Sequence, residues 1–136
     1  LPISLLAGNA APYDPWVGTW TLDVDRSKFA AGVAKPKSQT MVIDLASETT
    51  VKFSSDAVSA DGSKSHLEFV SGYDGKDNAV KGSTTIDTVS ITQPRPHYRT
   101  FIYKKGGEVV STNDVVLWGS AQLMTITSKE TRVSKL

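Results

Sequence analysis

The sequence predicts an all-β domain built as a closed, antiparallel, up-and-down β-barrel of about eight to ten strands. Three observations favour this fold. Short runs alternate apolar and polar residues, helical periodicity is nearly absent, and turn-forming residues interrupt the runs about every ten residues. A meander of that length exposes two strand edges if it stays open, and closure removes both. We therefore expect a barrel that encloses a cavity.

The alternating runs locate the strands. In the first run, Trp20, Leu22 and Val24 alternate with Thr21 and Asp23, which is the period of a strand with one buried face. Further runs of this kind lie at 41–45, 51–53, 67–69, 89–91 and 123–125. We expect Trp20 to pack on the floor of the barrel.

Pairs of turn residues separate neighbouring strands: Asp61-Gly62, Asp74-Gly75 and Gly106-Gly107. Each pair offers positive φ at little cost, as two-residue hairpin turns require. Hairpins in series join consecutive strands, which predicts the up-and-down order.

Two segments interrupt the strand pattern. Residues 26–37 belong to the main irregular stretch, and we expect a short helical or loop lid there, near one mouth of the barrel. Residues 94–96 (Pro-Arg-Pro) cannot lie inside a central strand, because proline has no amide donor for the ladder. They are expected to form a loop or the start of a strand.

Composition and charge argue against several classes of function. The 15 basic and 14 acidic residues are scattered and leave a net charge of +1, whereas nucleic acids are bound by clustered Lys and Arg. With no cysteine and two distant histidines, a zinc site is a poor match. No phosphate loop or dinucleotide fingerprint occurs. We expect no cofactor, no metal, no nucleic-acid partner and no membrane span.

The first 15 residues are set apart from the domain expected at 16–136. Residues 1–11 are largely apolar and end in small residues, as does the end of an export segment. A mature N-terminal arm is the alternative. The first interpretation predicts a periplasmic or secreted protein.

Gly18-Thr19-Trp20 at the start of the first strand resembles the Gly-x-Trp signature of the lipocalins and wider calycins. With the motifs at 26–29 (RSKF), 73–77 (YDGKD) and 103–107 (YKKGG), residues 16–127 resemble small exported bacterial lipocalin-like proteins. The resemblance implies a barrel and a periplasmic setting rather than a particular ligand. Asn78 and Ala79 depart from the aromatic residue and proline common in that group.

The strand before the 106–107 turn opens with residues that are unusual for the group, and we place the candidate site there. A two-residue turn fixes the register, so that Arg99 lies opposite Asp114 and His97 shares their face. We favour this face as the inward one because it also carries Phe101 and Tyr103. The predicted ligand-binding residues are His97, Arg99, Phe101, Tyr103, Thr112, Asp114 and Trp118.

Each polar candidate has two interpretations. Inside the barrel, Arg99 paired with Asp114 would anchor an acid group, because guanidinium donors form two parallel bonds to a carboxylate. Outside it, the same pair stabilises the fold by under about 1 kcal/mol. His97 is either a solvated loop residue or a general acid or base oriented by Asp114. His66 belongs either to a second inward cluster or to a surface pair with Glu68.

The sequence therefore predicts that a small hydrophobic or amphipathic molecule, with or without a carboxylate, binds in the cavity. The alternative is a cofactor-free isomerase, cyclase or lyase that uses His97 with Asp114 or Arg99 in the same cavity. A barrel filled by its own side chains would instead be a structural or partner-binding module.

Overall fold

Ten antiparallel strands make up the computed structural model, which describes residues 2–5, 14–32, 34–119 and 123–130. The all-β prediction is confirmed. The strands are β1 (Pro2–Leu5), β2 (Gly18–Leu22), β3 (Ser38–Leu45), β4 (Val51–Val58), β5 (Lys64–Ser71), β6 (Asn78–Ala79), β7 (Thr88–Arg95), β8 (Tyr98–Lys105), β9 (Glu108–Trp118) and β10 (Leu123–Glu130).

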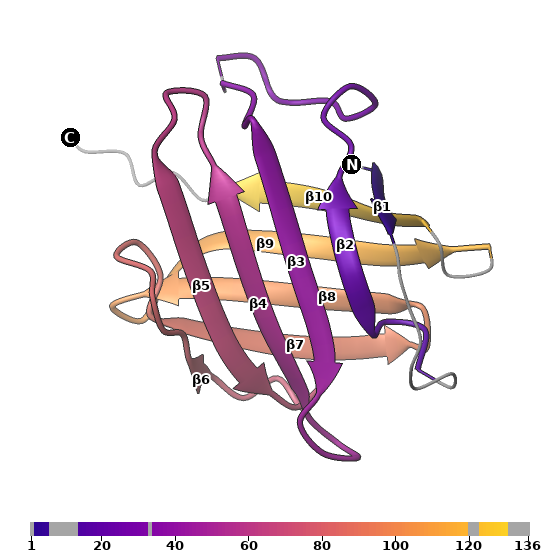
Figure 1. Cartoon of the computed structure of the whole chain (residues 1–136). Helices are drawn as coiled ribbons and strands as arrows, with labels where there is room; N and C mark the ends of the chain where they lie inside the picture. Colours follow the sequence, from indigo (N-terminus) through magenta and orange to yellow (C-terminus); the bar gives the residue numbers. More distant parts are fainter. Residues whose placement is uncertain (1, 6–13, 33, 120–122, 131–136) are drawn as a thin grey trace.

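The strands pair in the order β5-β4-β3-β2-β1-β10-β9-β8-β7-β6. This run folds into two layers that cross one another in Figure 1, with β2–β5 in front and β6–β10 behind. Strand β1, which comes from the segment expected as an N-terminal arm, pairs with both β2 and β10 and joins the layers. Alternation explains the packing, because each strand turns one set of side chains towards the facing layer.

The expected closed barrel is wrong. Closure requires a ladder between the two end strands, and across that gap the described residues form a single isolated bridge, between Glu68 and Lys81. The intervening chain explains why. Residues 72–87 are rich in Gly, Asp, Ser and Thr, which favour turns, and form only the two-residue strand β6. We call the gap between β5 and residues 80–87 the seam.

The helical form of the lid expected at 26–37 is also wrong. Across the described residues the structure has no helix, and so none that could span a membrane. Side chains at the start of the segment explain this. The Asp23 carboxylate accepts a hydrogen bond from Arg26 N, and Ser27 Oγ donates to Asp23 O. Such local bonds offer the backbone turns in place of a helix.

The core lies between the two layers and is rich in aromatic side chains. Phe53 and Phe69 stack with ring centroids 4.8 Å apart, and Phe101 from the other layer lies 6.0 Å from Phe53. Trp20 is buried, as expected, and its indole Nε1 donates to Trp16 O at 3.0 Å. Aromatic contacts across the layers thus hold together a sheet that no ladder closes.

Candidate binding cavity

A cavity of about 240 Å³ lies between the layers. The strands β3, β4, β5, β8, β9 and β10 turn side chains into it, and Trp16 and Ile86 complete its wall. Its apolar lining is Trp16, Met41, Ile43, Phe53, Leu67, Ile86, Phe101, Val115, Met124 and Ile126. Its polar lining is Gln39, Ser55, Tyr103, Ser111, Asn113 and Ser128. No charged residue occurs among these described lining residues.

Strand register separates an apolar end from a polar end. On the back layer, Val115 pairs with Ile126, and two residues earlier on β9 Asn113 pairs with Ser128. Successive inward positions of the same strands therefore change from apolar to polar.

Trp16 marks the apolar end on both layers. On the back layer it packs against Arg99, which pairs with Val115. On the front layer it lies two residues before Gly18 of β2, which pairs with Ile43. The polar end, formed by Gln39, Ser111, Asn113 and Ser128, is consequently the end away from Trp16.

Tyr103 brings a phenol to the cavity. It stacks on Phe101 with ring centroids 6.3 Å apart, and 7% of its surface is exposed. Burial raises the pKa of Tyr103, so the phenol keeps its proton at neutral pH. Desolvation alone drives this shift, without a hydrogen bond from a described residue. The hydroxyl is therefore free to donate or accept.

Asn113 is the second polar group that the fold leaves without a partner. It lies on β9 between Phe101 of β8 and Ser128 of β10. Its side-chain oxygen is buried and accepts no hydrogen bond from the described residues. A buried acceptor left unpaired destabilises a protein by about 1–3 kcal/mol. Such a residue is typical of a site that a ligand completes.

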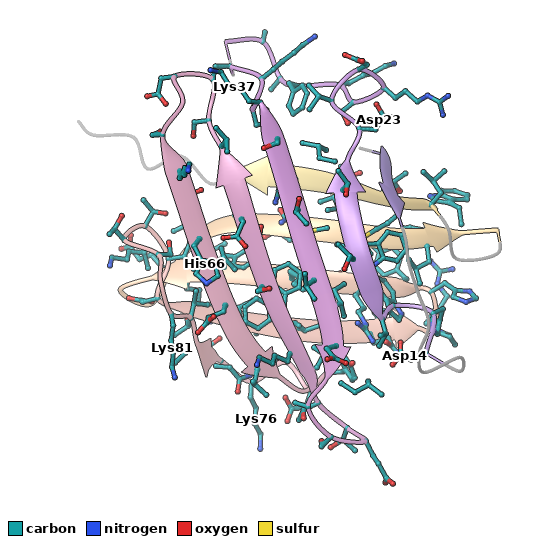
Figure 2. The ribbon with its side chains drawn as sticks, viewed as in Figure 1. Asp14, Asp23, Lys37, His66, Lys76 and Lys81 are labelled. Carbon is teal, nitrogen blue, oxygen red and sulfur yellow. The ribbon has the colours of Figure 1, made fainter. Side chains whose placement is uncertain are left out.

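Arg99 seals the apolar end from outside the cavity. Its guanidinium lies between the rings of Trp16 and Tyr73, 4.1 and 4.2 Å from their centroids. Nε donates to Gln93 Oε1 at 2.8 Å, and Nη1 is buried without a partner among the described residues. Burial lowers the pKa of Arg99, while Tyr73 and Asp14 oppose the shift; Asp14 is labelled in Figure 2.

The other side of the cavity adjoins the seam. A surface hollow along the seam shares Gln39, Ser55, Leu67 and Ile86 with the cavity. At the seam Gly82 has a φ of 88°, and a Cβ there would lie 3.0 Å from the His66 ring and carbonyl oxygen. The two edges of the seam are therefore in close contact beside this hollow.

His66 lies on the exposed face of β5 between two carboxylates, with Lys81 nearby across the seam (Figure 2). Its Nδ1 is 2.7 Å from Asp56 Oδ1, and its Nε2 is 3.2 Å from Glu68 Oε2. These hydrogen bonds, the one to Asp56 first, raise the pKa of His66. The surface interpretation of His66 is the one that the structure supports. Asp56 is an additional partner, because the 59–63 loop places it opposite His66.

The structure distributes the predicted ligand-binding residues over three places. Phe101 and Tyr103 line the cavity, and Arg99 lies behind Trp16. Outside the described cavity wall are His97, Thr112, Asp114 and Trp118. His97 is exposed in the turn between β7 and β8, and Trp118 is 53% exposed.

The predicted register of the β8–β9 hairpin is wrong beyond its first two pairs. Val110 is an extra residue in β9, and this bulge sets Arg99 opposite Val115 instead of Asp114. Asp114 therefore turns away from the cavity and accepts a hydrogen bond from Thr100 Oγ1 at 3.0 Å. Arg99 is buried on the inward side of β8 but packs against Trp16 and does not line the cavity.

The catalytic alternative depended on His97 acting with Asp114 or Arg99. No hydrogen bond or ion pair joins His97 to either residue in the part of the chain that the structure describes. Nor do three or more His, Asp or Glu side chains gather there in an arrangement that could hold a metal ion.

Sequence reasoning missed Asn113, Ser111 and Trp16 as cavity residues. The run Ser111 to Asp114 is polar at every position, so alternation carries no signal about which side chains point inwards. Trp16 lies before the first alternating run, so no pattern indicates which way its side chain points.

Comparison with known proteins finds no family model, no curated protein and no solved structure that matches the chain. The function proposed below depends on the geometry of the cavity alone.

Proposed function

We propose that the chain binds a small, neutral, largely apolar molecule in the cavity between its two layers. One observation carries the proposal: a cavity of about 240 Å³ whose described lining is aromatic, aliphatic and uncharged polar. Mostly apolar lining with a few polar groups is typical of small-molecule sites.

The uncharged lining favours a neutral ligand over a carboxylate. A carboxylate buried without a cationic partner carries a large desolvation penalty. Arg99 would be the natural partner, but Trp16 lies between its guanidinium and the cavity. The ligand proposed is therefore neutral, although the sequence left a carboxylate open.

The volume limits the ligand to a compact molecule. A dry cavity of about 150 Å³ accepts benzene, so about 240 Å³ accommodates about ten non-hydrogen atoms. Naphthalene has that size and serves as a probe. Long acyl chains exceed it.

Binding is tested with naphthalene and a matched pair of tryptophan variants, by equilibrium dialysis. Ser111→Trp places an indole inside the cavity, and Thr112→Trp places one on the outward face of the same strand. We expect wild type and Thr112→Trp to bind alike and Ser111→Trp to bind at least about tenfold more weakly. Equal binding by all three proteins, or no binding by wild type, would contradict the proposal.

A further inference from the structure

We infer that the ligand carries a hydroxyl group, which the polar end of the cavity recognises through Asn113 and Tyr103. This inference deepens the proposed function and rests on it. It names the class as compact aromatic or alicyclic alcohols and phenols, with the apolar body against Trp16 and the hydroxyl at the opposite end.

The first step is the position of the two groups. Ser111 lies directly opposite Tyr103 across the β8–β9 ladder, and Asn113 is the next inward residue of β9. Diagonal neighbours on one face of a sheet lie about 7–8 Å apart at their Cα atoms. One small polar group can therefore contact both side chains.

The second step is that neither group is used by the fold. The Asn113 oxygen accepts no hydrogen bond from the described residues. The pKa of the Tyr103 phenol is raised by burial, with no hydrogen bond contributing to the shift. By contrast, Gln39 on the facing layer donates from Nε2 to Ser55 Oγ at 3.1 Å. Gln39 and Ser55 are thus bonded to each other, whereas Asn113 Oδ1 has no partner among the described residues.

The third step is the kind of partner that these groups need. The unpaired Asn113 atom is a buried acceptor, and a ligand group that meets it after rotation of the amide about the Cβ–Cγ bond must be a donor. The protonated Tyr103 phenol donates as well as accepts, so the same ligand group should also accept. A hydroxyl does both with one atom, whereas an ether or carbonyl only accepts.

The test compares three probes of similar size: naphthalene, 1-methoxynaphthalene, which only accepts, and 1-naphthol, which donates and accepts. Dissociation constants are measured by isothermal titration calorimetry. We expect 1-naphthol to bind wild type about tenfold more tightly than 1-methoxynaphthalene, as one net hydrogen bond gives. In Asn113→Leu that preference should fall to about twofold or less.

Tyr103→Phe is the second variant and keeps the test decisive if Asn113→Leu does not fold. It should weaken the binding of 1-naphthol and of 1-methoxynaphthalene alike relative to naphthalene, because the phenol donates to either oxygen, whereas the outward-facing variant Thr112→Val should leave all three dissociation constants unchanged. If wild type binds all three probes equally, the inference is overturned and the proposed function stands. If wild type binds none of them, the proposed function itself fails.

Discussion

At the scale of single residues, two buried polar side chains have different relations to the cavity. Asn113 lines it and has an oxygen without a hydrogen bond among the described residues. Arg99 is 3% exposed, packs between two aromatic rings and does not line the cavity. Each has a buried polar atom without a described partner, Asn113 Oδ1 and Arg99 Nη1, but Arg99 also has two ring contacts and a hydrogen bond to Gln93.

Asn113→Leu is expected to raise the free energy of unfolding of the ligand-free protein by about 1 kcal/mol. Leucine has nearly the same shape and removes a buried acceptor that the described residues leave unpaired. Urea denaturation measures the change, with Thr112→Val as the outward control at within about 0.5 kcal/mol of wild type. A loss of stability in Asn113→Leu would show that the amide is satisfied in the folded protein.

Arg99→Ala is expected to lower the free energy of unfolding by about 2–4 kcal/mol, because it removes a buried side chain and its two ring contacts. The dissociation constant for naphthalene should stay within about threefold of wild type, since Arg99 does not line the cavity. Denaturation and calorimetry measure the two effects. Tighter binding of 1-naphthoate than of naphthalene, lost in Arg99→Ala, would instead make Arg99 the ligand anchor.

At the scale of strands and hairpins, register decides which side chains meet. Two-residue turns were expected at 61–62 and 106–107. The structure has a 59–63 loop in the first hairpin and a bulge at Val110 in the second. Each changes the pairing by one residue, and a one-residue change moves a side chain to the other face. His66 consequently meets Asp56, and Asn113 replaces Asp114 in the cavity wall.

The β4–β5 pairing makes a prediction about pH. Asp56→Asn should lower the pKa of His66 more than Glu68→Gln does, because the bond to Asp56 is the larger cause of its upward shift. A raised folded-state pKa contributes stability at pH values below the ordinary value of 6.5, and this is lost as the pH rises through the folded-state pKa. The pKa is read from the NMR titration of the His66 ring.

Because the raised pKa of His66 stabilises the folded protein at low pH, the effect of removing His66 should depend on pH. His66→Gln should differ from wild type in unfolding free energy more at about pH 5.5 than at about pH 9. If the difference in unfolding free energy between the two proteins grew towards high pH, the charged form of His66 would not be the stabilising one.

At the scale of the whole molecule, the seam distinguishes this fold from a closed barrel. A single described bridge crosses it, with Glu68 N donating to Lys81 O and Lys81 N to Glu68 O, both at 2.9 Å. The hollow along the seam shares part of its wall with the cavity. We expect ligand exchange to go through the seam, because only this bridge pairs the backbone there among the described residues.

A disulfide across the seam should therefore slow ligand exchange. Residues that exchange both hydrogen bonds have Cα atoms about 5.5 Å apart, which a disulfide can span. The double variant Glu68→Cys and Lys81→Cys, in a chain without other cysteines, should gain up to about 3 kcal/mol of stability on oxidation. Stopped-flow naphthalene release from the oxidised and reduced forms measures the exchange. Equal rates would place the opening elsewhere.

The sequence by itself determined the all-β class and the antiparallel order of the strands, and it favoured, without deciding, the face of β8 that carries Phe101 and Tyr103 as the inward one. These follow from alternation and turn residues, which act over a few neighbouring positions. Only the tertiary structure decided the open seam, the place of Arg99 behind Trp16 and the inward turn of Asn113. Each depends on one extra residue in a hairpin or on packing between distant segments, and neither leaves a mark in the local pattern of residues.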